Sequence, residues 1–510
     1  MDILTNTLKV QQSRRMTLEM ILSTHNRSCL TCVRSGNCEL QALCQEYGVE
    51  NADKYDGAKP ESEIDDSMVH MVRDNSKCIL CRRCVAACRE QDVAVIGAND
   101  RGFDTHIGCV FDEKLGRVDC ISCGQCIINC PTGALTEKDD TDKVYAALSD
   151  ETKTVIVQTA PAVRAAIGEE FGYEIGTNTE GKMVAALRRL GFDKVFDTNF
   201  SADLTIMEEA NELIDRVQNG GTLPLITSCS PGWIKYCEYH YPELLGNLSS
   251  CKSPQQMFGA ITKTWYAEKN GLDPKDIVCV SVMPCTAKKF EIGRADQSAA
   301  GVPDVDISIT TRELARMIKR AGIQFKNLPD ETFDNPLGES SGAGVIFGAT
   351  GGVMEAALRT AYETITGSTL EDVDFTAVRG TDPVKVTELK VGDLNVKVGV
   401  ASGGKAAKEL LTRVKNGEEF TFIEIMGCPG GCVNGGGQPI HPSSVRQTVD
   451  IKALRAKALY QEDAGKAIRK SHENPVIKAL YDEYLGKPGS HKAHEILHTS
   501  YVDRSREAIM

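Results

Sequence analysis

The sequence lacks an excess of positive charge: its formal net charge is −13 over 510 residues. Proteins that bind nucleic acid neutralise phosphates with lysine and arginine, so this charge argues against nucleic acid as the main partner. Long apolar runs are also missing, and none approaches the length that crosses a bilayer. The first residues, MDILTNTLKV, lack the charged and apolar regions of a secretory signal peptide. We therefore expect a cytoplasmic protein with no membrane partner.

The sequence also lacks the glycine spacing of nucleotide-binding loops. The glycine-rich stretch SGAGVIFGATGG, residues 341–352, follows neither G-x-G-x-x-G nor the P-loop pattern. We interpret these glycines as allowing close packing around a cofactor, because glycine has no side chain to hold neighbouring groups apart. No flavin or NAD motif is present in the rest of the chain. Any such function would therefore need another subunit.

Cysteine, by contrast, is abundant, with 20 residues. Most lie in tight C-x2-C runs rather than in the dispersed pairs of a disulfide scaffold, which indicates metal ligands in a reducing compartment. Two runs share the spacing C-x2-C-x2-C-x3-C of bacterial ferredoxins with two [4Fe–4S] clusters. In that arrangement the fourth cysteine of each run binds the cluster of the other run. The predicted ligand sets are Cys78, Cys81, Cys84 and Cys130 for one cluster, and Cys120, Cys123, Cys126 and Cys88 for the other.

A third group of potential ligands precedes these runs: His25, Cys29, Cys32 and Cys38. Three cysteines and a histidine form an accepted zinc site, so the residue types alone fit zinc and an iron–sulfur cluster equally. Two ferredoxin-type clusters in a row form an electron conduit, because protein sulfur caps all their iron atoms. Beside such a conduit, the group is better interpreted as a third [4Fe–4S] cluster, whose histidine ligand favours a higher potential.

After residue 135 the sequence alternates apolar runs with stretches of helical periodicity. This alternation predicts an α/β domain with largely parallel strands. The expected strands are Thr154–Thr159, Leu223–Thr227, Ile277–Met283, Val305–Ile309, Val396–Ala401 and Thr421–Met426. The expected helices include Gly181–Leu190, Leu204–Val217, Thr311–Ala321 and Val353–Thr364.

Four more cysteines come directly after expected strands: Cys229, Cys285, Cys428 and Cys432. In α/β domains ligands bind beyond the carboxyl ends of the strands, so we expect these thiols to converge on one metal site. The glycines around the last two cysteines leave room for a bulky cofactor. The predicted fold is an α/β catalytic domain with largely parallel sheets around a buried metal cofactor, preceded by small α+β, ferredoxin-like iron–sulfur domains.

Three motifs resemble those of the [FeFe]-hydrogenases, and the resemblance covers essentially the whole chain. The motifs are TSCSPGW (Thr227–Trp233), MPCTAKKFE (Met283–Glu291) and EIMGCPGGCVNGGGQP (Glu424–Pro439). The resemblance implies reversible conversion of protons and electrons to H₂ at an H-cluster. In that family the H-cluster joins a [4Fe–4S] cubane to a two-iron unit that carries CO, CN⁻ and a bridging dithiolate. Maturation proteins for the two-iron unit are implied as well.

The resemblance also implies roles for individual residues of the metal site. Cys285 and Cys428 would hold the cubane, and Cys432 would bridge it to the two-iron unit. The cyanides would be held by Lys288 and by the backbone near two residues, Pro161 and Gln255. Two side chains would line the pocket: Met283 and Met426.

One motif departs from the family pattern. TSCSP in this chain is usually TSCCP, where the first cysteine relays protons and the second binds the cubane. The second position here is Ser230. Three alternatives follow: Ser230 binds iron through oxygen, Cys229 becomes the ligand, or the cubane is altered. A serine alkoxide is a poorer iron ligand than a thiolate, so cluster occupancy depends on which alternative holds.

The expected helix over 204–217 carries Glu209, Glu212 and Arg216. By themselves these residues fit a solvated face with an ion pair between Glu212 and Arg216. The family resemblance implies instead a proton path that runs through Cys229, Glu209, Ser249, Glu212 and Arg216 to solvent. A thiol beside iron is a suitable proton shuttle, because its pKa can be tuned towards neutrality.

We expect four domains: 1–65 with the one-histidine cluster, 66–145 with two ferredoxin-type clusters, 146–442 with the H-cluster, and 443–510 as a helical wrapping segment resembling a hydrogenase small subunit. Ferredoxin, flavodoxin or NAD-linked partner subunits would exchange electrons with the chain. One alternative is the catalytic subunit of an NAD-linked, electron-bifurcating complex. Another is a non-catalytic H₂ sensor or iron–sulfur assembly factor of related fold. The cysteines of the plant-type [2Fe–2S] domain that the family often carries are missing from this sequence.

Overall fold

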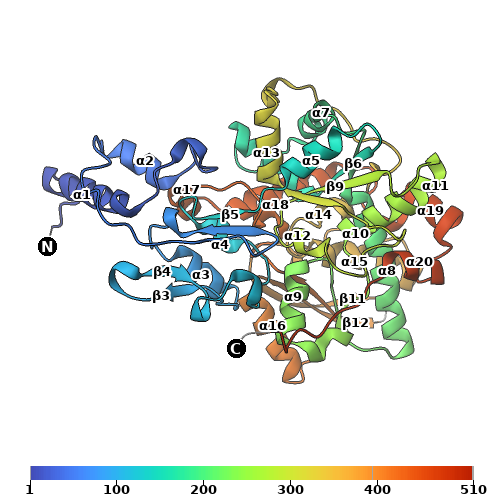
Figure 1. The fold of residues 1–510 in the computed structure, drawn as a ribbon. Helices are drawn as coiled ribbons and strands as arrows, with labels where there is room; N and C mark the ends of the chain where they lie inside the picture. Colours follow the sequence, from blue (N-terminus) through green and yellow to red (C-terminus); the bar gives the residue numbers. More distant parts are fainter. Residues whose placement is uncertain (1, 393, 508–510) are drawn as a thin grey trace.

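The computed structural model describes residues 2–392 and 394–507. Two four-stranded sheets form the centre of its larger part, and helices surround them (Figure 1). The first sheet is wholly parallel, in the order β10-β9-β6-β7. Its strands are β6 (Thr154–Thr159), β7 (Lys194–Asp197), β9 (Ile277–Met283) and β10 (Ile307–Thr310).

The first sheet is buried on both faces. Val155 and Val157 of β6 pack into one hydrophobic cluster with Leu187, whereas Ile156 packs into a second cluster with Phe258 on the opposite side. A strand that is buried on both faces reads as a continuous apolar run rather than as an alternating one. This arrangement explains why β6 and β9 could be predicted from apolar runs.

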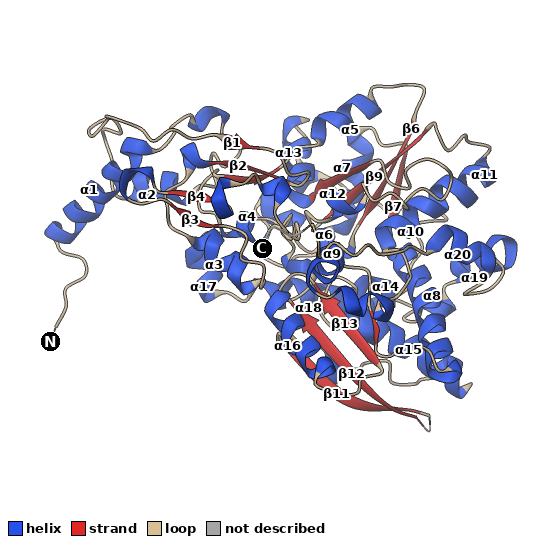
Figure 2. Cartoon of the chain, turned by 60° about the horizontal axis from the view of Figure 1, so that its bottom comes forward, coloured by secondary structure: helices blue, strands red, loops and turns tan. Residues whose placement is uncertain are grey.

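The second sheet has the order β11-β12-β13-β8. Its strands are β8 (Leu225–Ile226), β11 (Val384–Val391), β12 (Leu394–Ser402) and β13 (Phe422–Met426). The strands β12, β13 and β8 are parallel, whereas β11 is antiparallel to β12. Figure 2 shows the β11–β12 hairpin reaching away from the other sheet. The prediction omitted β7 and β11; β11 reads VKVTELKV, an alternation of apolar and polar residues that is typical of a half-exposed strand.

Four predicted helices are present with shifted ends: α7 (Glu180–Leu190), α8 (Thr198–Asn219), α13 (Thr311–Arg320) and α15 (Gly352–Thr366). Helix α8 begins early because the Asp197 side chain accepts a hydrogen bond from the Asn199 amide, and it ends at Gly220, whose φ is +77°. The capping box of Thr310 and Glu313 starts α13. Shorter helices connect the strands: α5 (Thr141–Leu148), α6 (Pro161–Arg164), α9 (Pro231–His240), α10 (Pro254–Ile261), α11 (Ala267–Asn270), α12 (Lys288–Glu291), α14 (Gly342–Ile346) and α16 (Gly404–Lys415).

The C-terminal residues form short helices that pack on the larger part: α17 (Ser443–Thr448), α18 (Ile451–Gly465), α19 (Pro475–Leu480) and α20 (His491–Leu497). Arg455 and Asp463 of α18 are buried and bond to Glu169 and Arg359, respectively. Among the described residues, no helix has the length and apolar character needed to span a membrane.

The N-terminal part is built from short elements and extends to one side of the molecule (Figure 1). A three-stranded antiparallel sheet and a two-stranded hairpin lie beside four helices. The elements are α1 (Leu8–Thr24), α2 (Glu39–Glu46), β1 (Ile64–Asp65), β2 (Met71–Asp74), α3 (Arg83–Glu90), β3 (Gly97–Asn99), β4 (His106–Gly108), α4 (Gln125–Asn129) and β5 (Leu135–Glu137). The predicted fold class, a largely parallel α/β domain preceded by small α+β domains, is therefore confirmed.

Polar contacts join the ferredoxin-like part, residues 66–145, to the larger part, residues 146–507. The Gln91 side chain donates to the Gly427 carbonyl at 2.9 Å and accepts from the Gly404 amide at 2.7 Å. Buried Arg312 pairs with Glu137 at 2.6 Å. These contacts place the cysteine runs directly against the loop that carries Cys428.

Candidate functional site

A cavity lies where the carboxyl ends of strands from both sheets meet. Its walls come from the segments that follow β6, β8, β9 and β13, as expected for a parallel α/β fold. Eight of the predicted site residues line it: Pro161, Cys229, Gln255, Met283, Cys285, Lys288, Met426 and Cys432.

The thiols of the larger part lie close enough to affect one another's ionisation. Burial raises the pKa of Cys428, and the charges of Cys285, Cys123 and Cys432 raise it further. Cys428 is buried, and Cys285 and Cys432 are half-buried. Ionised thiolates gathered there need a cation such as iron to balance their charge. The structure thus brings together three cysteines from distant parts of the sequence.

Ser230 and Cys229 point to different neighbours. The Ser230 hydroxyl oxygen accepts a hydrogen bond from the Gly427 amide at 3.0 Å, which places it beside Cys428. Cys229 lines the cavity instead, and after burial the main influence that raises its pKa is Glu209. Ser230 therefore lies next to Cys428, whereas Cys229 lies in the cavity wall with Cys432 and close to Glu209.

Glycines allow the loop after β13 to pass close to neighbouring backbone. Gly431 has φ +94°, and a Cβ atom there would lie 2.7 Å from the Thr350 amide nitrogen. A Cβ atom on Gly435 would lie 2.2 Å from the Pro284 carbonyl oxygen. Larger residues would push the loop, and with it the last two cysteines, away from the cavity.

A buried ionic group holds one wall of the cavity. Lys288 Nζ bonds to Glu291 Oε2 at 2.9 Å and to the Cys229 carbonyl at 3.2 Å. The same Glu291 oxygen accepts from Gln255 at 2.9 Å and from Ser253 at 2.8 Å. Glu291, the final residue of the MPCTAKKFE motif, had no predicted role. It orients the two side chains that reach the cavity, Lys288 and Gln255.

Hydrogen bonds join three of the predicted relay residues: Ser249, Glu212 and Arg216. Ser249 Oγ donates to Glu212 Oε2 at 2.8 Å, and Arg216 donates to Glu212 Oε1 at 2.6 Å. Burial and the nearby charge of Glu212 raise the pKa of Glu209 to about 8, while a hydrogen bond from Ser249 opposes this rise. Arg216 and Glu212 are only partly buried, so this end of the predicted path lies near the surface. Glu209 lies between Glu212 and Cys229, because its charge raises the pKa of Cys229.

The two ferredoxin-type ligand sets each gather in one place. Burial raises the pKa of Cys84, as do the charges of Cys130, Cys78 and Cys81. Burial likewise raises the pKa of Cys126, and its strongest charged neighbours are Cys123, Cys120 and Cys88. These groupings correspond to the exchange of the fourth cysteine between the runs. Cys428 Sγ lies 4.0 Å from the Cys123 carbonyl oxygen, so the second set borders the thiols of the larger part.

The third predicted ligand group, His25, Cys29, Cys32 and Cys38, lies beside the first ferredoxin-type set. Cys29 is exposed, Cys32 packs over Gly133 beside the first ferredoxin-type set, and the charge of Cys32 contributes to raising the pKa of Cys38 after burial. His25 is buried, and among the described residues its Nδ1 has no hydrogen-bond partner. Burial and the charge of Lys77 lower the pKa of His25, which favours the neutral ring that binds metals.

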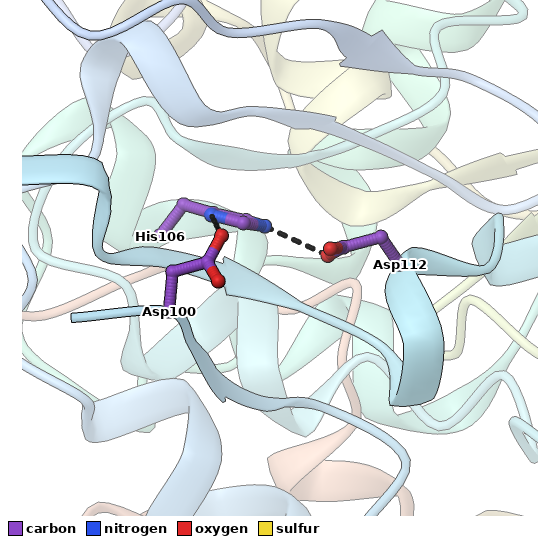
Figure 3. A group of neighbouring side chains, drawn as sticks. All are labelled: Asp100, His106 and Asp112. Carbon is purple, nitrogen blue, oxygen red and sulfur yellow. Dashed lines mark hydrogen bonds and ion pairs between the residues drawn. The ribbon is translucent and has the colours of Figure 1, made fainter.

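One further group of titratable side chains lies on the β3–β4 hairpin of the ferredoxin-like part (Figure 3). His106 Nε2 lies 2.7 Å from Asp112 Oδ1, and its Nδ1 lies 3.0 Å from the Asp104 carbonyl oxygen. Asp100 lies farther away, 3.8 Å from Nδ1. Hydrogen bonds thus occupy both ring nitrogens, and the group ties the hairpin together.

Comparisons with known proteins agree with this geometry. The family described as "Iron only hydrogenase large subunit, C-terminal domain" matches residues 153–436, and "Iron hydrogenase small subunit" matches residues 449–504. Upstream, the family described as "NADH-ubiquinone oxidoreductase-G iron-sulfur binding region" matches residues 14–53, and "4Fe-4S dicluster domain" matches residues 77–134.

Similar whole proteins support the same assignment. The chain is 52% identical to the NADP-reducing hydrogenase subunit HndD of Solidesulfovibrio fructosivorans, with 99% of this chain and 87% of that protein covered. It is 46% identical to iron hydrogenase 1 of Clostridium pasteurianum, with 98% and 88% covered. The structure of apo [FeFe]-hydrogenase HydA1 from Chlamydomonas reinhardtii matches with a TM-score of 0.65 and 43% identity, over 73% of this chain and 100% of that one. Together with the converging thiols, these matches show that the chain belongs to the [FeFe]-hydrogenase family.

Proposed function

We propose that the chain catalyses the reversible reaction 2H⁺ + 2e⁻ ⇌ H₂ at an H-cluster. The observation that carries the proposal is the cavity at the strand ends, which gathers Cys229, Cys285, Cys432 and Lys288 in its walls. A second series of cysteines leads from its edge to the surface, so electrons and protons have separate approaches. Membership of the hydrogenase family supports the reaction type.

The donor set fits the cofactor that this family implies. Cys285, Cys428 and Cys432 supply soft sulfur ligands suited to iron, and Ser230 supplies the fourth position. When bound, the H-cluster supplies the organometallic iron centre at which H₂ is formed or split. The protein would hold it by these four residues, while Lys288 and Gln255 offer donors to its anionic groups. Met283 and Met426 are buried and keep water out of the same cavity.

We propose Ser230, rather than Cys229, as the fourth ligand of the cubane. The support is that the Ser230 hydroxyl lies against the Gly427 amide next to Cys428, whereas Cys229 faces Glu209. This arrangement leaves Cys229 available to carry protons. We expect Ser230→Cys to raise the iron content per chain and to strengthen the cubane EPR signal, because thiolate binds iron better than alkoxide. Unchanged iron content together with an unchanged EPR signal would contradict this assignment.

We propose that protons travel through Cys229, Glu209, Ser249, Glu212 and Arg216. The hydrogen bonds of Ser249 and Arg216 to the two Glu212 oxygens support this order. Glu212→Gln should slow H₂ turnover by ~10²-fold or more, the usual scale for loss of a proton-transfer group, and leave the infrared CO and CN⁻ bands intact.

The matched control is Asp215→Asn, since Asp215 is exposed on the same helix and bonds only to Asn219 through its side chain. Its turnover should equal that of the unaltered protein. Full activity of Glu212→Gln would remove Glu212 from the path.

We propose three [4Fe–4S] clusters between the cavity and the electron partner. Cys120, Cys123, Cys126 and Cys88 would hold the nearest one, and the His25 group would hold the most distant one, where Cys29 is exposed. The proposed domains are 1–65, 66–145, 146–442 and 443–510. Iron and sulfide analysis of the protein lacking the two-iron unit tests this count, because each cluster contributes four iron atoms.

The partner is proposed to be either ferredoxin or flavodoxin, or NAD(P)-linked subunits. The second choice is supported by the similarity to HndD, which is named as a subunit of an NADP-reducing hydrogenase. H₂ production from reduced methyl viologen tests the reaction itself, and CO and CN⁻ infrared bands after maturation test the cofactor. Intact bands without H₂ turnover would favour the sensor alternative, and absent bands the assembly-factor alternative.

A further inference from the structure

The C-terminal segment after α20 pairs with the strand-like segment that carries the relay serine. The Lys252 amide donates to the Leu497 carbonyl at 2.8 Å, and the Thr499 amide donates to the Ser250 carbonyl at 2.8 Å. Cys251 and His498 pair as antiparallel neighbours. Helices α8, α19 and α20 lie side by side in both Figure 1 and Figure 2. Residues from the end of the chain therefore fix the position of residues 249–252.

His498 joins this segment to a buried carboxylate. Its Nδ1 lies 2.8 Å from Ser250 Oγ, and its Nε2 lies 3.1 Å from Glu208 Oε2. A neutral ring that donates from Nε2 to the Glu208 carboxylate accepts a hydrogen bond at Nδ1, so the Ser250 hydroxyl donates to it. Glu208 is fully buried and also accepts from Tyr481 and from the Gly489 amide at 2.9 Å.

Ser250 in turn holds the relay carboxylate. Its backbone amide donates to both oxygens of Glu212, at 3.1 and 3.3 Å, beside the bond from Ser249 Oγ. The groups that surround His498 are Glu208, Tyr481, Cys251, Glu212 and the exposed His494, which stacks on it with ring centroids 3.9 Å apart. None of the cysteines proposed as metal ligands contacts His498 through a hydrogen bond within the described residues.

We propose that His498 is a positioning residue of the proton relay: through its bond to Ser250 it sets the direction of the amide and hydroxyl groups that hold Glu212. The inference rests on the proposed relay through Glu212. No bond forms or breaks at His498, and no proton needs to pass through it. Its effect comes from fixing residues 249 and 250, because a hydrogen-bond donor that turns away no longer holds the carboxylate at transfer distance.

Two substitutions of His498 distinguish the roles of its two ring nitrogens. His498→Asn places a polar atom near Nδ1 and keeps a partner for Ser250, whereas His498→Gln places one near Nε2 and keeps a partner for Glu208. We expect the Asn variant to retain H₂ turnover and the Gln variant to lose about fivefold, the rate equivalent of one hydrogen bond. The antisymmetric carboxylate stretching band of Glu212 should shift only in the Gln variant, while the CO and CN⁻ bands stay unchanged in both.

Ser250→Ala provides a second test if either His498 variant fails to fold. This substitution removes only the hydroxyl that bonds to the His498 ring. It should reproduce the fivefold loss and the shifted Glu212 band. His491→Asn is the matched control, since this histidine begins α20, the helix that precedes His498, and its side chain is 90% exposed. It should alter neither turnover nor the band.

Two results would overturn the inference: unaltered turnover in His498→Gln and Ser250→Ala, or equal losses in the Asn and Gln variants. These results are distinct from failure of the proposed function itself. If the relay is wrong, Glu212→Gln keeps full activity, and if the cofactor is wrong, the CO and CN⁻ bands are absent from the unaltered protein.

Discussion

The N-terminal 145 residues and the rest of the chain bury their apolar side chains to different extents. Of nineteen large apolar side chains that are exposed in the described chain, fifteen belong to the N-terminal part. Leu30 and Phe111 are 101% and 88% exposed there. In the larger part, by contrast, both sheets are packed on two faces by apolar clusters. The hydrophobic effect therefore stabilises the larger part far more per residue.

The two parts also differ in backbone strain. In the described residues, every non-glycine residue with positive φ lies in the ferredoxin-like part: Leu80, Arg82, Asp92, Ala94, Asp100, Phe111, Asp112 and Ser122. Each such conformation costs about 1–2 kcal/mol for an ordinary residue. Leu80 and Arg82 lie between cysteines of the first run, and Ser122 lies between cysteines of the second. Binding of iron offsets this cost, because it holds the loop in the strained shape.

The two parts therefore depend on different sources of stability. The N-terminal part is small, has strained loops and exposes apolar side chains. It therefore needs metal ligation to remain folded, as small domains generally do. The larger part has a large apolar core and buried ion pairs, so it does not need metal ligation to remain folded.

The largest expected effect follows removal of iron. Hydrogen exchange of the chain stripped of iron under anaerobic conditions should show loss of protection over residues 78–130, because the ligated loops lose what holds them. Helices α7 and α15, with core residues Leu187 and Leu358, should keep their protection. Equal loss in both regions would show that the clusters stabilise the whole chain rather than one part.

A buried ion pair in the larger part should give the next largest effect. The Arg359 side chain is fully buried and bonds to Glu355 at 2.7 Å and Asp463 at 2.9 Å, which are both fully buried. Arg359→Met removes the fully buried cation that joins these two carboxylates, although Glu355 keeps Arg379 and Asp463 keeps Arg469 as partly exposed partners. We therefore expect a loss of about 3 kcal/mol of stability, the lower end of the range for a broken buried ion pair. The denaturant midpoint of the iron-loaded chain measures this loss.

The control for that variant is Arg189→Met. Arg189 is 43% exposed and lies 3.4 Å from Glu331, so its loss should cost less than about 1 kcal/mol. Similar midpoints for the two variants would contradict a role of the buried pair in stabilising the larger part.

Two substitutions that involve glycine should change stability in opposite directions, one in each part of the molecule. Leu80 has φ +55° and is 41% exposed, so Leu80→Gly relieves strain and should stabilise the N-terminal part by up to about 1 kcal/mol. Gly220 ends α8 with φ +77°, and Gly220→Ala should destabilise by about 1 kcal/mol. Thermal midpoints check both, and changes of the same sign would show that positive φ is not what distinguishes these loops.

The smallest expected effect concerns pH. The hydrogen bond to the Asp104 carbonyl and the one to Asp112 raise the pKa of His106 above its ordinary value of 6.5. Its contribution to stability is therefore fully present below pH 6.5 and is lost as the pH rises through the higher pKa of the folded state. Because the His106 side chain is 31% exposed and its partner Asp112 is 57% exposed, solvent screens the pair and the effect should be only a few tenths of a kcal/mol. His106→Asn should remove this part of the pH dependence of the thermal midpoint, and an unchanged profile would rule it out.

Sequence spacing alone determined much about this protein. The doubled C-x2-C-x2-C-x3-C runs predicted which cysteines gather, and the apolar runs predicted strands such as β6 and β9 that end at the metal site. These features are local, because a ligand run and a buried strand carry their signal within a few residues. The strand β11 was missed although its alternation was present, and β7 was too short to stand out.

Only the tertiary structure decided which way the side chains of the site face. TSCSP does not reveal that Ser230 lies by Gly427 while Cys229 faces Glu209, because both neighbours come from distant segments. Nothing in the sequence around Glu212 reveals that His498, near the end of the chain, reaches Ser250. Such contacts depend on how separate elements pack, and residue order within one segment does not specify that packing.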